Sequence, residues 1–258
     1  MTPRYGASLD LRFDETVEEY VAFLADLGLS HVELRWGYLD THPDAPDPVR
    51  LREVASAHDV TVTVHAPHVD ANPGNVNEQL RRGTVDAIRD ALEYAAAADA
   101  VGVVVHGGAA RTRYPERVQS RSRAQAIRTL REAADAAAEL DVPLCLENQR
   151  DKPGRLRNTA TPDRLAALLA DVEAGADASR LYVTLDVGHA KVTGVDYGAF
   201  VDRFGDRIRV AHLHDNDGTD DDHDPLPAFR EVAAEVGAPY NVLEMKSLAD
   251  VERCVGGA

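Results

Sequence analysis

The segment over residues 208–223 holds the densest group of side chains that could bind a metal ion. It begins with Ile208, Val210 and Leu213, whose apolar character indicates a short buried strand, and continues through His and Asp residues around Gly218. An acidic, glycine-containing segment is often only a solvated loop. Imidazole and carboxylate groups that directly follow a buried strand can also bind a divalent cation, and the rest of the chain favours this second interpretation.

Five other predicted strands also end in an acidic or imidazole side chain. The six strand-end residues are His65, His106, Glu147, Asp186, His212 and Glu244, and His189 follows three positions after Asp186. One such residue alone is more often a hydrogen-bonded polar group than a metal ligand. Six in consecutive strands predict one shared site, and imidazole with carboxylate suits Zn²⁺, Mn²⁺, Fe²⁺ or Co²⁺.

The strands that carry these residues alternate with helices along the chain. We expect strands at 5–9, 31–34, 60–64, 101–105, 142–146, 181–185, 208–213 and 240–243. We expect helices at 15–28, 48–58, 79–97, 117–140, 162–174, 197–204, 225–236 and 248–255. Eight strand-helix units in 258 residues predict an α/β fold, a single (β/α)₈ TIM barrel domain over residues 1–258. Active sites of such barrels lie at the C-terminal ends of the strands, which brings the six residues to one mouth.

The composition restricts the class of partner. The formal net charge is −16, from 44 Asp plus Glu against 28 Lys plus Arg, which disfavours general attraction to nucleic acid. Only three cations are Lys, and scarce Lys with excess carboxylate suggests a halophilic host. The two cysteines, Cys145 and Cys254, predict no disulfide framework, and no signal peptide or membrane span is recognisable. We therefore expect a cytoplasmic protein with no membrane partner.

These motifs resemble the xylose isomerase-like barrel superfamily, in register from His65 to Glu244. That superfamily includes ketose epimerases, inosose-processing enzymes, sugar phosphate isomerases and type IV apurinic endonucleases. The resemblance to its isomerase members implies one divalent metal, with Mn²⁺, Zn²⁺, Co²⁺ or Mg²⁺ as candidates. The implied ligands are Glu147, Asp186, His212 and Glu244.

The resemblance to the endonuclease members implies a larger set of ligands. Those enzymes bind three zinc ions with the same four positions and five more, which correspond here to His65, His106, His189, Asp221 and His223. In the isomerase members the residue that matches His189 contacts the substrate. All nine ligand types are present in this chain, so both classes of reaction remain open at this stage.

Three departures from the endonucleases favour the isomerases. The chain is shorter than those endonucleases, its charge is strongly acidic, and residues 224–227 replace the Gly-x-Gly that usually follows their Asp-x-His. The ketose epimerases do not match fully either, because Asp217, Gly218 and Thr219 occupy the stretch where an Arg is expected in them. We therefore expect a metal-dependent sugar or sugar phosphate isomerase or epimerase, with the endonuclease-like phosphodiesterase as the alternative. Nucleic acid would be a partner only under that alternative, and a barrel that binds metal and ligand without turnover is a third hypothesis.

The isomerase chemistry assigns a role to the carboxylates. Interconversion next to a carbonyl requires a proton to be removed and returned, so carboxylates should flank the reacting carbon. Glu147 and Glu244 are the candidates for this transfer, and His189 is a third catalytic candidate through substrate contact.

Two loops carry positive charge that is unusual for this chain. Arg111 follows the fourth strand, and Arg150, Lys152 and Arg155 follow the fifth. Guanidinium groups hold phosphate in a bidentate geometry, so these four residues are predicted to bind an anionic part of the substrate. The expected partner is therefore a small anionic sugar.

Overall fold

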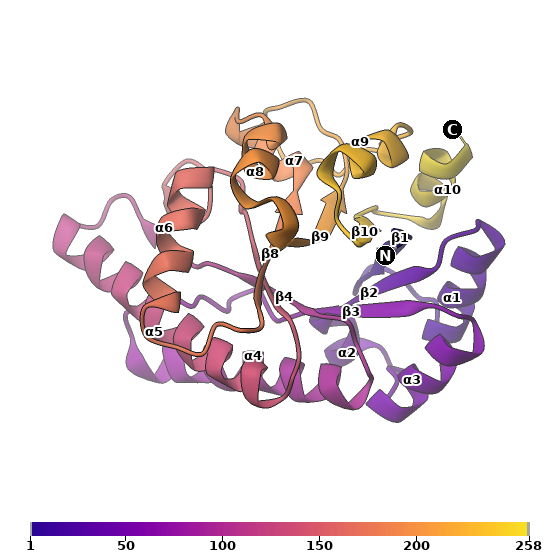
Figure 1. The fold of residues 1–258 in the computed structure, drawn as a ribbon, viewed down its shortest axis with the longest axis horizontal. Helices are drawn as coiled ribbons and strands as arrows, with labels where there is room; N and C mark the ends of the chain where they lie inside the picture. Colours follow the sequence, from indigo (N-terminus) through magenta and orange to yellow (C-terminus); the bar gives the residue numbers. More distant parts are fainter. Residues whose placement is uncertain (1, 257–258) are drawn as a thin grey trace.

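Strands and helices alternate along the chain and close into a barrel (Figure 1). The computed structural model describes residues 2–256. All eight barrel strands are parallel, in the order β1-β10-β9-β8-β6-β4-β3-β2, with β2 paired to β1. Their bounds are β1 (Arg4–Leu9), β2 (His31–Arg35), β3 (Thr61–His65), β4 (Val103–His106), β6 (Leu144–Glu147), β8 (Leu181–Asp186), β9 (Ile208–Leu213) and β10 (Tyr240–Leu243). The predicted TIM barrel is confirmed.

The eight predicted helices are also present, and they surround the barrel (Figure 1). They are α1 (Val17–Asp26), α3 (Pro48–Ala57), α4 (Glu78–Ala97), α5 (Glu116–Glu139), α6 (Pro162–Glu173), α8 (Tyr197–Phe204), α9 (Phe229–Val236) and α10 (Leu248–Gly256). Local sequence explains where several of them begin. The Thr16 side chain accepts a hydrogen bond from the Glu19 backbone in a capping box, and Thr161 precedes a Pro at the first position of α6.

The expected start of one helix at Pro225 was wrong, because α9 begins at Phe229. Asp224 is instead held in an extended bridge to Asp215, where each backbone N–H donates to the other residue's carbonyl at 2.8 Å. Pro227 also disfavours the helical conformation of Leu226, the residue before it, which further delays the start.

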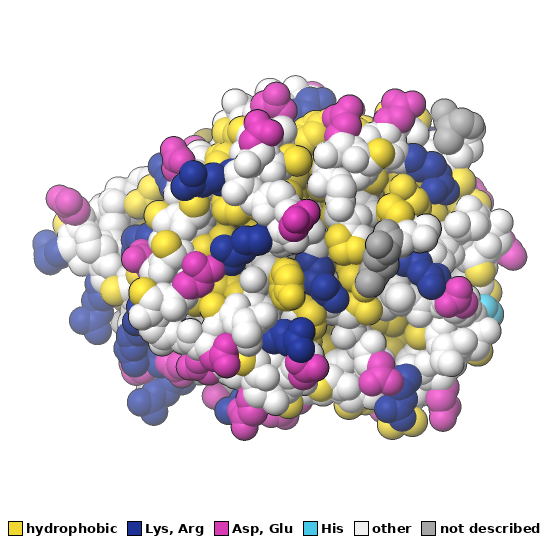
Figure 2. All heavy atoms as spheres, in the orientation of Figure 1, with side chains coloured by type: hydrophobic (Ala, Val, Ile, Leu, Met, Phe, Trp, Pro, Cys, Tyr) yellow, Lys and Arg dark blue, Asp and Glu magenta, His cyan; other side chains and the backbone are white. Residues whose placement is uncertain are grey.

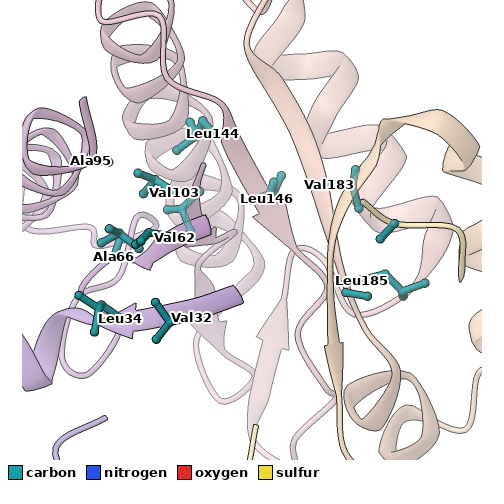
Figure 3. Packing of buried hydrophobic residues seen from close by; sticks show 14 of the residues in the cluster. Val32, Leu34, Val62, Ala66, Ala95, Val103, Leu144, Leu146, Val183 and Leu185 are labelled. Carbon is teal, nitrogen blue, oxygen red and sulfur yellow. The ribbon is translucent and has the colours of Figure 1, made fainter. Parts of the chain in front are cut away.

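The two faces of each strand lie in different environments, one against the helices and the other in the barrel interior. In β3, Val62 and Val64 join the apolar layer between strands and helices, whereas Thr63 and His65 alternate with them and face the barrel interior. Figure 3 shows part of the apolar layer, where side chains from several strands gather beside Ala95 of α4. This alternation lets one strand support the core and position a functional residue at its end.

The lower barrel interior is filled with side chains. A separate apolar cluster there consists of Val104, Cys145, Val210, Tyr240 and Val242. The Arg209 guanidinium lies between the rings of Tyr182 and Tyr240, at 5.2 and 5.3 Å from their centroids. The barrel interior is therefore a packed core, so residues at the mouth above it can be substituted without removing its packing contacts.

Five short elements were not predicted. They are α2 (Trp36–Thr41), α7 (Val187–Thr193), the 3₁₀ turn η1 (Gly205–Arg207), and the strands β5 (Ala109–Arg111) and β7 (Arg155–Arg157). The last two pair as an antiparallel ribbon outside the barrel sheet. Elements of three to seven residues are too short to show a period in sequence.

Acidic and basic side chains are interspersed over the face of the molecule shown in Figure 2. Among residues 2–256, no helix combines the length and the apolar character that crossing a membrane requires.

Candidate metal centre and active site

The mouth of the barrel contains a ring of buried ionisable side chains. Period-two alternation carries inward-facing residues up each strand, so that β6 ends at Glu147, β8 ends at Asp186 and β10 is followed by Glu244. Asp186 lies beside His212 in the register of β8 and β9. Each of these four residues is at most 2% exposed. Four of the six strand-end residues singled out in the sequence therefore lie together at the mouth.

The Nδ1 atom of His212 faces three carboxylates. It lies 3.0 Å from Glu244 Oε1, 3.8 Å from Glu147 Oε1 and 4.0 Å from Asp186 Oδ2. This buried nitrogen forms no hydrogen bond of adequate geometry with any described residue. Close approach without hydrogen-bond alignment is the arrangement expected of ligands around a common cation.

His65 and His106 form a second group around the other oxygen of Glu147. Their Nε2 atoms lie 3.3 and 3.0 Å from Glu147 Oε2, which is also a buried atom without a hydrogen bond among the described residues. His65 donates its Nδ1–H to the Ala66 carbonyl at 2.9 Å, so its Nε2 lone pair points at the carboxylate. Two acceptors in contact repel each other unless a proton or a cation lies between them.

A third group surrounds Asp221 in the loop after β9. Asp221 Oδ2 lies 3.2 Å from His189 Nε2 and 3.6 Å from His223 Nε2, and Asp221 Oδ1 lies 3.7 Å from His214 Nε2. His189 and His223 each turn Nδ1 toward a backbone carbonyl at 2.9 Å, which again directs Nε2 at the carboxylate. Histidine residues that bind metals are commonly oriented in this way, by a hydrogen bond from the other ring nitrogen to a backbone carbonyl.

The Asp-x-x-His motif is the start of a short helix. Asp186 is the N-cap of α7, and its side chain accepts a hydrogen bond from the His189 backbone at 2.7 Å. The glycine between them is required by packing, since a Cβ at Gly188 would lie 2.0 Å from the His214 ring. One short element thus fixes two imidazoles and one carboxylate.

Burial and neighbouring charges have opposite effects on the pKa values of Glu147 and His212. Burial alone would raise the pKa of Glu147, but His106, His189 and His212 outweigh it and hold that pKa well below its usual range. Burial alone would lower the pKa of His212, but Glu244 and Glu33 raise it well above its usual value. Without a cation, Glu147 is therefore ionised and His212 is protonated, whereas burial lowers the pKa of His106.

Several residues of this cluster were not predicted. Glu33, in the middle of β2, places Oε1 3.1 Å from His212 Nε2, and Arg35 forms an ion pair with Glu244. His214 places Nε2 3.1 Å from Asp186 Oδ1, and the His68 ring packs against those of His65 and His106. The alternation of side chains along a strand could have identified Glu33, Arg35 and His214. Glu33 and Arg35 alternate with Val32 and Leu34, and His214 follows His212 by two positions.

Two cavities flank this cluster. One, of about 580 Å³, is lined by Arg111, Lys152 and Arg155 together with His68 and His106. Three of the four predicted anion-binding residues therefore gather there. Arg150 lies elsewhere, with Nη1 3.4 Å from Asp221 Oδ2.

The other cavity, of about 380 Å³, is mostly apolar. Leu11, Trp36, Pro67 and Val69 line it, and it reaches His223 at the edge of the cluster.

Comparison with known proteins defines the class. A family model described as xylose isomerase-like TIM barrel matches residues 21–244, and the chain belongs to this family. It is 34% identical over 186 residues to the uncharacterized protein MJ1311 of Methanocaldococcus jannaschii, an alignment covering 71% of this chain and 61% of that protein. It is 26% identical over 211 residues to the uncharacterized protein MJ1614 of the same organism, covering 79% of this chain and 78% of that protein.

Solved structures of sugar epimerases have the same fold. A D-tagatose 3-epimerase-like protein superimposes with a TM-score of 0.79 and 28% identity, covering 97% of this chain and 94% of that one. A D-allulose 3-epimerase from Methylomonas sp., solved in complex with D-allulose, has a TM-score of 0.72 and 15% identity, covering 95% of this chain and 84% of that one. The second likeness concerns the fold alone.

Proposed function

We propose that the chain is a divalent-metal-dependent isomerase or epimerase that transfers a proton next to the carbonyl of a sugar or sugar phosphate. The observation that carries this proposal is the convergence of Glu147, Asp186 and Glu244 on His212 Nδ1. Membership of the xylose isomerase-like family and the likeness to sugar epimerases support it.

The residues present fit a divalent cation. Three carboxylates and one imidazole lie at the strand ends, and two of their buried atoms, Glu147 Oε2 and His212 Nδ1, have no hydrogen bond among the described residues. We assign Glu147, Asp186, His212 and Glu244 as the ligands. A bound cation would polarise the sugar carbonyl and stabilise the negative charge that develops beside it.

The proton transfer falls to Glu147 and Glu244. They approach the mouth from β6 and from the end of β10, on two sides of His212, so one can remove a proton and the other can return it. Arg35 pairs with Glu244 and keeps it ionised, since burial would raise the pKa of Glu244 but Arg35 and His212 hold it well below the usual range. His189 touches both Glu147 and Asp186 and is placed to orient a substrate hydroxyl.

Loss of one glutamate tests this assignment. Metal-loaded protein is incubated with a panel of aldoses, ketoses and their phosphates, and products are identified by NMR. Glu147→Gln and Glu244→Gln should each lower turnover at least about 100-fold, the scale of acid-base catalysis, with the fold retained. The matched control is Glu252→Gln, an exposed residue of α10 that should leave turnover unchanged. Full activity in Glu147→Gln would refute the assignment.

A trinuclear phosphodiesterase is the second candidate, and the two further groups of ligand types favour it. His65, His106 and Glu147 form one group, and His214, Asp221 and His223 form the other. Under this alternative, His106→Ala should empty a metal position and stop cleavage of abasic DNA. Under the isomerase proposal, His106 orients Glu147, and the same variant should keep one ion and weakened turnover, about 10–100-fold lower. Metal content per chain and a nicking assay separate the two.

We also propose that the protein functions in the cytoplasm. Cys145 and Cys254 are both buried and free, which suits a reducing cytoplasm.

A further inference from the structure

The β5–β7 ribbon concentrates positive charge on one face. Its antiparallel register places Arg111 opposite Arg155 and Ala109 opposite Arg157. Opposed residues and residues two apart share a face of such a ribbon, so all three guanidinium groups project to the same side. A further bridge between Lys152 and Arg155 brings a fourth cation to this side.

These four cations line one wall of the 580 Å³ cavity. One carboxylate, Asp70, lines it as well. A cavity of this volume lies within the usual range for small-molecule sites. The chain as a whole has 44 acidic and 28 basic residues, so this wall, where cations outnumber carboxylates, has the opposite charge balance.

No acidic side chain within residues 2–256 forms an ion pair with this wall. The charged groups of Arg111, Lys152, Arg155 and Arg157 form no ion pair and no hydrogen bond with any residue there, while many other arginines do, such as Arg81 with Glu78 and Glu132. Arg155 and Arg157 are also partly buried. Burial, together with Arg150 and Arg155, lowers the pKa of Arg157. The cluster thus repels itself and would be stabilised by a bound anion.

The cavity leads directly to the metal centre. His106 lines it and places Nε2 3.0 Å from Glu147 Oε2. Gln149, two residues after Glu147, also lines the cavity. It is only 6% exposed, and its Oε1 has no hydrogen-bond partner among the described residues. A buried, unsatisfied amide at the junction of cavity and catalytic cluster indicates a missing hydrogen-bond donor such as a sugar hydroxyl.

We propose that the β5–β7 ribbon holds a phosphate ester of the substrate while the sugar's carbonyl end reaches Glu147 and Glu244. This inference rests on the function proposed above and adds the substrate class. Guanidinium groups bind phosphate oxygens in pairs through short, charge-assisted hydrogen bonds. Arg155 and Arg157 supply this geometry from the ribbon, and the more exposed Arg111 and Lys152 add charge at the rim.

A small phosphate ester fits this site better than a nucleic acid backbone. The loop after β9 carries Asp217, Asp220, Asp221 and Asp222. Asp220 is largely exposed and lies near Arg150, so it would repel a polyanion that crossed the mouth. A single phosphate inside the cavity avoids this loop.

The test compares phosphorylated and neutral substrates in matched variants. The double variant Arg155→Gln/Arg157→Gln should raise KM for a ketose phosphate by about 10–100-fold more than KM for the parent ketose, as expected for lost charge-assisted hydrogen bonds. Arg113→Gln removes the same charge from the adjoining loop but does not line the cavity, and it should change neither. Lys152→Gln changes an exposed side chain outside the ribbon strands. It should also raise KM for the ketose phosphate more than KM for the ketose, but by a smaller factor than the double variant.

A binding measurement separates this proposal from the catalytic one. Inorganic phosphate is titrated into the metal-loaded protein and detected by calorimetry. Ribbon-dependent phosphate binding in a protein that converts no sugar would support the anion site and refute the isomerase. Turnover with equal KM effects on both substrates, or phosphate binding unchanged in the double variant, would overturn the anion site. Displacement of phosphate by abasic DNA, with nicking, would assign the ribbon to nucleic acid and overturn the proposal for a small substrate.

Discussion

Glu33 is predicted to control metal affinity although it would not contact the ion. It is fully buried inside the barrel and lies below His212, with Oε1 3.1 Å and Oε2 3.2 Å from His212 Nε2. Thr63 donates a hydrogen bond to Glu33 Oε2 at 3.0 Å, which fixes the carboxylate. Because Glu33 accepts the Nε2 proton, it is Nδ1 that would lose its proton and bind an ion beside the three carboxylates.

The informative change is Glu33→Gln. The side chain keeps its volume, so no cavity forms, but the negative charge that supports the His212 tautomer is lost. Changes in such outer partners cost about 10–100-fold in metal affinity. This range corresponds to about 1.4–2.8 kcal/mol of binding free energy at 25 °C.

The assay is competition for Mn²⁺ or Zn²⁺ between the protein and a chromophoric chelator. Wild type, Glu33→Gln and the exposed control Glu252→Gln are compared at one pH, with circular dichroism to check the fold. We expect weaker binding only in Glu33→Gln. Wild-type affinity in a folded Glu33→Gln protein would refute the claim that Glu33 orients His212.

Three further predictions concern the proton on His212, the packing at Gly188 and the effect of salt. Because His212 has a raised pKa, protonation stabilises the metal-free fold fully below the unfolded pKa of about 6.5, and this contribution is lost as pH rises through the folded value. Metal must displace that proton, so metal affinity should rise with pH and binding should release protons, as measured with an indicator dye; no release would contradict it. Gly188→Ala would place a Cβ 2.0 Å from the His214 ring, so chelator competition should show weaker metal binding, and unchanged affinity would contradict the packing argument. If the acidic excess reflects a halophilic host, the melting temperature should rise between low and molar KCl, and a flat curve would count against it.

The barrel could be predicted because its elements are long and periodic. Amphipathic helices such as α4 and α5 and alternating strands such as β3 each carry a complete pattern. Strand ends then placed Glu147 and Asp186 at the mouth without any knowledge of their contacts, because all parallel strands of a barrel end on the same side.

The residues that were missed depend on contacts between strands. Glu33 lies in the middle of its strand, so no rule about strand ends identifies it, and its partner His212 is distant in sequence. The β5–β7 ribbon consists of two three-residue strands whose pairing arises from the loops over the mouth. Arg150 and Arg155 looked equivalent in sequence, but only the fold shows that one faces Asp221 and the other faces the cavity.

The most direct test of the central claim is incorporation of solvent deuterium into a sugar. Metal-loaded protein is incubated in D₂O with a ketose phosphate, and the recovered sugar is analysed by mass spectrometry and NMR. We predict deuterium at the carbon next to the carbonyl, with incorporation abolished by chelator and by Glu147→Gln. A metal-loaded, folded protein that introduces no deuterium into any ketose or ketose phosphate, while it nicks abasic DNA, would contradict the proposed proton transfer.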